Sequence, residues 1–220
     1  MRSAVAAGAA MSVAGCAGYT VEKSDKIEQK EAKIENQSAR IEELNGTVAD
    51  LESKVESLNS TNNELESTVE QTKKDLDAAR NKQVLCLYSA GMTNLNSGIE
   101  YYNSAIDRFN AGNTRGSRAD FNVASGYFGS ATTDFGRAAE RAGASEAATV
   151  KQYAKDAQQY ASITAQECAD YQQEMYYRLK GNTSKAEEYR SKAEAHRQNA
   201  KSYKVRDLSD LEGRLGTTIE

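Results

Sequence analysis

The sequence has no proline and no tryptophan, and a single histidine, His196, occurs among its 220 residues. Because proline is the residue that most strongly breaks helices, nothing in the composition forbids long uninterrupted helices. A lone histidine excludes chemistry that requires several imidazoles from one chain. Ala193 stands three residues before His196, where diiron bundles place a glutamate, so we interpret His196 as a core or boundary residue.

Cysteine and net charge are also low. The three cysteines, Cys16, Cys86 and Cys168, are too few and too scattered for a disulfide scaffold or a zinc site. The net charge of −4 gives no global signature of nucleic-acid binding, so we expect no nucleic-acid partner. Phosphate-cradling glycine loops, HExxH, CxxC and nucleophile elbows are absent, and we therefore expect neither catalysis nor a metal or other cofactor.

The N-terminus has the layout of an export signal, with Arg2 ahead of an apolar run from Ala4 to Gly15. At about 12 residues this run is too short to span a bilayer as a helix. It ends in the tetrapeptide VAGC, at residues 13–16, in which an aliphatic residue and two small residues precede a cysteine. This order resembles the lipobox of prokaryotic lipoproteins.

The resemblance covers residues 1–16 only and implies a specific processing route. Val13, Ala14 and Gly15 would be recognition positions, residues 1–15 a signal peptide, and Cys16 the lipidated anchor. Residues 16–19 would then form a short lipid-anchored linker, and the protein would be extracytoplasmic and membrane-anchored. A free cysteine in a disordered terminus, or a misassigned start codon on a cytosolic protein, remains an alternative.

Residues 20–82 carry a heptad repeat that predicts a coiled-coil stalk. The a positions are Ile27, Ile34, Ile41, Val48, Val55, Asn62, Val69 and Leu76. The d positions are Lys30, Gln37, Leu44, Leu51, Leu58, Leu65, Thr72 and Ala79. β-Branched residues at a with leucine at d favour a parallel dimer, in which two facing Asn62 side chains would fix the register. About 60 residues at 1.5 Å each would make a rod of roughly 90 Å.

Residues 83–215 are predicted to form a helical head, followed by a tail at residues 216–220. At its start, the heptad frame of the stalk gives way to a new stripe of apolar residues in a shifted frame. These residues are Leu85, Tyr88, Met92, Leu95, Ile99, Tyr102, Ile106 and Phe109. Glycine-containing loops divide the rest, and the expected helices cover 83–111, 117–142, 145–180 and 184–215. Expected N-caps are Ser117, Ser145 and Ser184. The fold class is therefore all-α, a parallel coiled coil followed by an up-down antiparallel bundle of about four long helices.

The tripeptide GNT occurs twice in the head, at residues 112–114 and 181–183. An aromatic residue follows each copy, and an alanine stands twelve residues after each glycine. The pattern weakly resembles the turn of tetratricopeptide repeats, which implies helical hairpins. Those repeats fit two short helices into about 34 residues, whereas single helices here run about 26 to 36, so the lengths argue against membership.

The head offers three candidate contact features. Tyr101, Tyr176 and Tyr177 are expected near the loop end of the first and third head helices, as a partner surface or as rim residues of the core. A basic strip at residues 185–206 suits an anionic partner or is simply a solvated face. Cys86 is a candidate for an interchain disulfide, because it falls at a d position if the stalk frame continues, whereas Cys168 belongs to a core stripe.

These features favour a non-enzymatic envelope lipoprotein in which the stalk is a spacer and the head binds an unknown envelope protein or wall polymer. The expected partners are the membrane, through the N-terminal lipid, and a second copy of the chain. The alternative is an extracytoplasmic helical bundle that binds a small molecule in a tyrosine-lined cavity. A solid core with exposed tyrosines would favour the scaffold, and a ligand-sized cavity with convergent polar groups would favour the binder.

Overall fold

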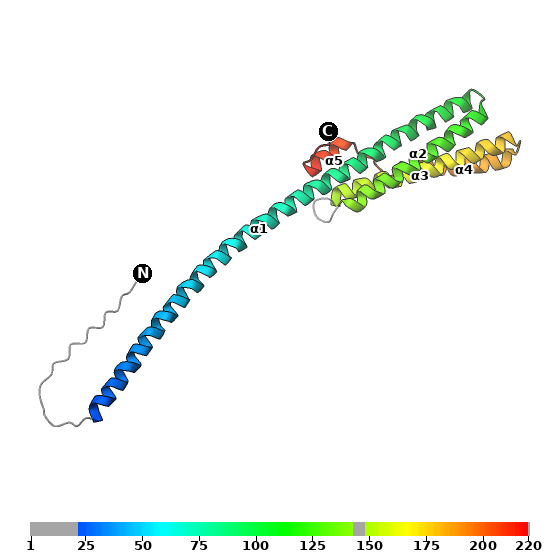
Figure 1. The fold of residues 1–220 in the computed structure, drawn as a ribbon. Coiled ribbons are helices and arrows are strands. Elements are labelled where there is room, and N and C mark those ends of the chain that lie inside the picture. The colour runs from blue at the N-terminus through cyan, green and yellow to red at the C-terminus, as the bar shows by residue number, and fades with distance from the viewer. Residues whose placement is uncertain (1–21, 143–147, 220) are drawn as a thin grey trace. The chain divides into compact units, whose positions relative to one another are not determined.

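The computed structural model describes residues 22–142 and 148–219, and within these ranges the chain is helical and contains no strand (Figure 1). The five helices are α1 (Glu22–Asn110), α2 (Thr114–Arg141), α3 (Ala148–Leu179), α4 (Thr183–Ala200) and α5 (Leu208–Leu215). The all-α prediction is therefore confirmed for the described residues. The predicted signal peptide, its recognition positions and Cys16 lie outside them.

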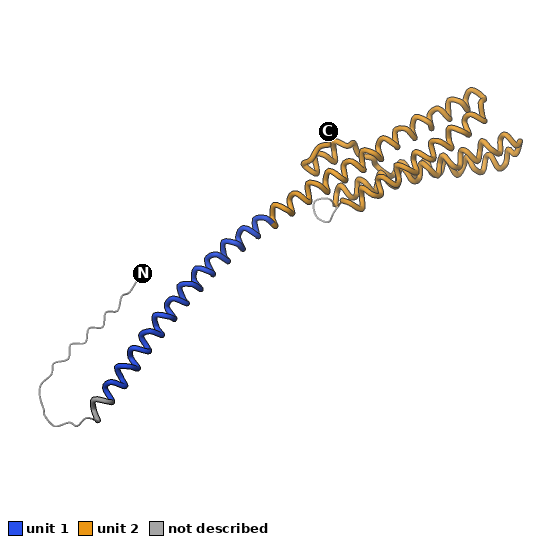
Figure 2. The backbone as a smooth tube through the Cα atoms, viewed as in Figure 1, with its two compact units in different colours: residues 1–68 blue, residues 69–220 orange. Residues whose placement is uncertain are grey.

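The chain divides into two compact units, residues 1–68 and 69–220, so α1 contributes to both (Figure 2). Every side chain from residue 26 to residue 80 is exposed. The first buried side chains along α1 are those of Val84 and Leu85, and from there onward the helix has a buried face.

The packing of α1 on α2 pairs large residues with small ones at heptad spacing. On α2, Phe128 and Phe135 are fully buried, seven residues apart. Opposite them on α1 lie Gly98 and Gly91: a Cβ atom added at Gly98 would stand 2.8 Å from Phe128 Cε1, and one at Gly91 would stand 2.7 Å from Phe135 Cδ1. Because residue numbers rise along α2 while those of their partners fall along α1, the two helices are antiparallel. The rings fill the space that the glycines leave.

Seven of the eight residues of the predicted stripe on α1 are buried or packed against the core, and Ile99 is the exception. Ile99 was expected in the core but is 37% exposed. Glycine carries no hydrophobic side chain, so a search for large apolar residues skips Gly91 and Gly98 and rotates the predicted face toward Ile99.

Both GNT turns have the same construction, which corrects two predicted N-caps. Gly112 and Gly181 adopt left-handed backbone conformations, with φ of 77° and 70°. The asparagine that follows each glycine caps the next helix: the Oδ1 of Asn113 accepts from the N–H of Gly116 at 2.9 Å, and that of Asn182 from the N–H of Lys185 at 3.1 Å. The predicted caps were wrong, because an asparagine placed directly after the left-handed glycine starts the helix before the serine is reached.

Those serines, Ser117 and Ser184, therefore lie inside α2 and α4. Ser145 lies outside the described residues.

The fourth predicted head helix, 184–215, is interrupted. α4 ends at Ala200, and α5 begins at Leu208 after an irregular connection. The hydroxyl of the buried Tyr88 holds this connection by donating to the carbonyl of Arg206 at 2.7 Å and accepting from its N–H at 3.2 Å. The break lets Leu211 of α5 turn into the core.

Candidate binding site in the head

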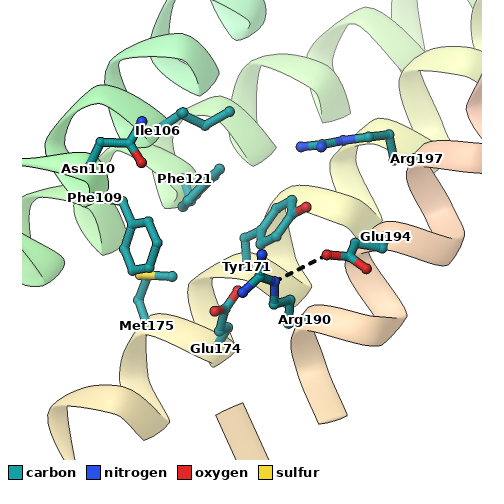
Figure 3. Close-up of a pocket in the computed structure, with 10 residues that line it drawn as sticks. All are labelled: Ile106, Phe109, Asn110, Phe121, Tyr171, Glu174, Met175, Arg190, Glu194 and Arg197. Carbon is teal, nitrogen blue, oxygen red and sulfur yellow. Dashed lines mark hydrogen bonds and ion pairs between the residues drawn. The ribbon is translucent and has the colours of Figure 1, made fainter. Parts of the chain in front are cut away.

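A pocket of about 180 Å³ opens between α1, α2, α3 and α4, and side chains from all four helices converge on it (Figure 3). The lining residues are Ile106, Phe109, Asn110, Phe121, Tyr171, Glu174, Met175, Arg190, Glu194 and Arg197. One side is therefore aromatic and aliphatic, and the other carries two arginines and two glutamates.

The apolar wall is built from stacked rings. The rings of Phe121 and Tyr171 stack with their centroids 5.1 Å apart, and Tyr102 meets Phe121 edge-on at 5.6 Å. The ring of Phe109 carries the guanidinium of Arg178 at 5.3 Å. These contacts join α1, α2 and α3 and fix the shape of the wall.

A buried glutamate on α3, Glu167, holds one of the lining residues, Arg197, in place. Glu167 is 3% exposed, and its Oε1 accepts from the Tyr102 hydroxyl at 2.6 Å and from Arg197 Nε at 2.8 Å. Arg197 also donates to the Tyr102 hydroxyl and lies 5.5 Å over the Tyr171 ring. Burial, together with the adjacent carboxylate, raises the pKa of Tyr102 far above its usual value, so its hydroxyl remains a donor across the physiological range.

A second buried glutamate, Glu174, lines the pocket two helical turns after Glu167 on α3. It is 2% exposed, and its contacts with Arg178, 2.7 Å from Nε and 2.6 Å from Nη2, both fall on Oε1. Its other oxygen, Oε2, is thus available to a ligand. On α4, Arg190 contacts Glu194 through Nε at 3.1 Å, which leaves the terminal amino groups of this guanidinium available as well.

The three tyrosines singled out in the sequence fall into two separate groups. Tyr101, 39% exposed, stacks on Tyr127 of α2 with ring centroids 5.5 Å apart. Tyr176 and Tyr177 meet edge-on at 5.2 Å, and Tyr177 stacks on Tyr189 at 5.5 Å. The second group lies at the turn between α3 and α4.

Cations surround this second group: Arg118 and Lys180 face the Tyr176 ring, and Lys185 faces the Tyr177 ring. We call Tyr176, Tyr177 and Tyr189 with these three cations the tyrosine–cation cluster.

Much of the predicted basic strip is neutralised locally. Arg190, Lys192 and Arg197 pair with Glu194, Glu188 and Glu167, respectively. His196 is partly buried, and its Nε2 lies 3.4 Å from Asp170 Oδ2, an arrangement typical of a boundary histidine. The described residues contain no group of three or more side chains arranged to hold a metal ion.

Cys86 is exposed and Cys168 is buried, and both are free thiols. Burial raises the pKa of the Cys168 thiol well above its usual value, which keeps this thiol protonated and unreactive. Asn62 donates to Glu66 Oε1, one helical turn later, at 2.9 Å.

Sequence reasoning missed Glu167 and Glu174 and recognised Arg197 only as a member of the basic strip at residues 185–206. The available signal was the seven-residue spacing of the two glutamates, which places both beside the core residues Cys168 and Met175 on one face of α3. Charged residues at such positions are rarely buried without partners, so each required a cation from a neighbouring helix.

The described residues are all-helical, and the head contains a pocket with an aromatic wall and charged side chains. Comparison with protein-family models, with curated proteins and with solved structures found no match to this chain. In the part of the chain that the structure describes, no helix combines the length and the apolar character needed to cross a membrane.

Proposed function

We propose that the chain is a non-enzymatic envelope lipoprotein, anchored through Cys16, with residues 20–82 as a dimeric parallel coiled-coil spacer. The head, an up-down antiparallel bundle over residues 83–215, would bind another envelope protein or a wall polymer. The VAGC motif supports the anchor, and the observation that carries the proposal is the exposed apolar seam of α1.

Eleven large apolar side chains of α1 are between 52% and 68% exposed: Ile27, Ile34, Ile41, Leu44, Val48, Leu51, Val55, Leu58, Leu65, Val69 and Leu76. All occupy a or d positions of the heptad repeat. Soluble proteins rarely expose so long a contiguous apolar surface unless a partner covers it. A second copy is the occupant that fits best, since its seam has the same spacing and knobs-into-holes packing buries both.

The tyrosine–cation cluster supports a contact role for the head. Tyrosine and arginine are enriched among residues that contribute most to binding, and here Arg118 of α2 lies over the ring of Tyr176 of α3. The cations would favour an anionic partner, such as an acidic protein surface or an anionic wall polymer.

Lysine at both Leu51 and Leu58 should convert the dimer into a monomer, because each dimer would then bury two pairs of charges in its seam. Sedimentation equilibrium on the chain lacking residues 1–16 would measure the mass. Replacing Ser53 and Ser60 with lysine is the matched control, since these residues lie at the outer f position of the same two heptads. A wild-type monomer at micromolar concentration would contradict the spacer proposal, and a trimer would contradict its dimeric form.

Cys16→Ser should abolish lipid attachment completely, because the sulfur is the only group that the resemblance assigns to the diacylglyceryl chain. Metabolic labelling with radioactive palmitate in a bacterial host, followed by fractionation, would compare this variant with wild type. Cys86→Ser is the control and should keep the label. Unlabelled wild-type protein in the soluble fraction would refute the anchor.

A second candidate, an extracytoplasmic binder of small molecules, is favoured by one observation: the pocket in the head has apolar walls and convergent polar groups. The two functions are compatible, because the pocket and the tyrosine–cation cluster use different residues.

A further inference from the structure

We propose that the head pocket binds a free α-amino acid with an apolar side chain, the zwitterionic ligand whose three parts match the three kinds of lining. This proposal does not depend on the lipid anchor or on the stalk, because every lining residue belongs to the head.

The apolar wall would take the side chain of the ligand. Phe109, Phe121, Ile106 and Met175 line the pocket next to the Tyr171 ring. The stacking of Phe121 on Tyr171 keeps this wall in place without a ligand. A preformed apolar wall loses little conformational entropy on binding, which favours affinity.

Two guanidinium groups would take the carboxylate of the ligand. Arg197 is held by Glu167 and Tyr102 through Nε and one terminal amino group, and Arg190 is held by Glu194 through Nε. Each arginine therefore has at least one terminal N–H donor left, and both side chains line the pocket. Arginine donors suit carboxylates particularly well, because charge and planar geometry match.

Glu174 would take the ammonium group of the ligand. Its carboxylate is almost completely buried, lines the pocket, and contacts Arg178 through Oε1 alone. The other oxygen of this carboxylate, Oε2, would accept a charge-assisted hydrogen bond from the ammonium group.

The charge balance around the pocket selects a zwitterion over a simple ion. Three carboxylates, those of Glu167, Glu174 and Glu194, face three guanidiniums, those of Arg178, Arg190 and Arg197. Because these charges sum to zero, a simple anion or a simple cation would add one uncompensated charge to the pocket. A ligand that carries both charges leaves neither end unmatched.

The size of the pocket limits the side chain. A volume of about 180 Å³ corresponds to the liquid volume of about six water molecules at ~30 Å³ each. This fits a single amino acid with a side chain of the size of leucine.

Calorimetric titration of the full chain with L-leucine, isocaproate and isoamylamine tests the proposal directly. Isocaproate lacks the ammonium group of leucine, and isoamylamine lacks its carboxylate. We expect leucine to bind at least about tenfold more tightly than either analogue, because each lost charged hydrogen bond is worth that much or more. Equal affinity for leucine and one analogue, or no binding of leucine at millimolar concentration, would overturn the proposal.

Single substitutions test which residue binds the carboxylate group of the ligand and which binds its ammonium group. Arg190→Gln should weaken leucine binding at least about fivefold, whereas Arg137→Gln, at an exposed position of α2 away from the pocket, should not change it. Glu174→Gln should weaken leucine binding, and it should leave isocaproate binding unchanged or tighten it, because isocaproate has no ammonium group and no longer meets a like charge. Arg190→Gln removes only an exposed ion pair and should fold normally. If this variant binds leucine as tightly as wild type does, the assignment is overturned, even if Glu174→Gln fails to fold.

Discussion

The substitution Gly98→Leu is expected to lower the free energy of unfolding of the head by about 3 kcal/mol. The first added carbon alone would lie 2.8 Å from the ring of Phe128, well inside van der Waals contact. That ring is buried and packed on all sides, so it has no free space into which to move. Any gain in helix propensity from replacing glycine, about 1 kcal/mol, is too small to offset the clash.

Urea unfolding followed by tyrosine fluorescence would measure the loss, because every tyrosine except Tyr19 lies between residues 88 and 203. Gly129→Leu is the matched control: it lies in the middle of α2, where an added Cβ meets nothing within 4 Å. This variant should be as stable as wild type or slightly more stable.

A compensating change separates steric overlap from a general helix effect. Phe128→Ala alone should cost about 3 to 5 kcal/mol by leaving a cavity. Combined with Gly98→Leu, it should cost less than the sum of the two single changes by more than 1 kcal/mol, because the leucine fills part of the cavity. Additive losses would show that Gly98 and Phe128 do not form the contact described here.

The contact between Gly98 and Phe128 shows which parts of this fold the sequence pattern predicts and which it does not. Phenylalanines recur at heptad spacing in the sequence of α2, at positions 121, 128 and 135, a pattern that predicts a helix with one bulky face, and all three are buried. The glycines that receive them were not recognised, because hydrophobic periodicity gives weight to side chains and none to their absence. The missing proline and the heptads of residues 20–82 favour a long helix there, and α1 continues without a break through the shift in the stripe to Asn110. The connection after Ala200 is held by the hydroxyl of the distant Tyr88, which gives no local signal.

The pocket was harder to predict than the fold. Tyr171 and Met175 follow Cys168 at helical spacing, so the core stripe predicted for Cys168 extends to them, and they form part of the apolar wall. Which charged residues join them is decided by tertiary neighbours: Glu167 on α3 meets Tyr102 from α1 and Arg197 from α4. Sequence separations of 65 and 30 residues carry no local periodic signal, so only the packed structure reveals the network.

The substitution Arg197→Met is expected to lower the free energy of unfolding of the head by about 3 kcal/mol. It removes the cation beside the buried Glu167 carboxylate, which keeps the Tyr102 hydroxyl as its remaining partner. The value is at the lower end for a broken buried ion pair, since the Arg197 side chain is 40% exposed and water can replace part of its contact. Arg190→Met is the matched control on the same helix; both side chains of its ion pair with Glu194 are 54% exposed, so its loss should cost less than about 1 kcal/mol.

A double-mutant cycle identifies the cause of the larger loss. Glu167→Gln removes the buried charge, so Arg197→Met should cost at least about 1 kcal/mol less in that background than in wild type. If the loss instead came from the apolar stem of Arg197 packing over Tyr171, methionine would retain most of that contact, and the single variant would be nearly as stable as wild type. Equal losses in both backgrounds would mean that Glu167 does not depend on Arg197. The urea midpoint of the tyrosine signal in the four proteins decides between these outcomes.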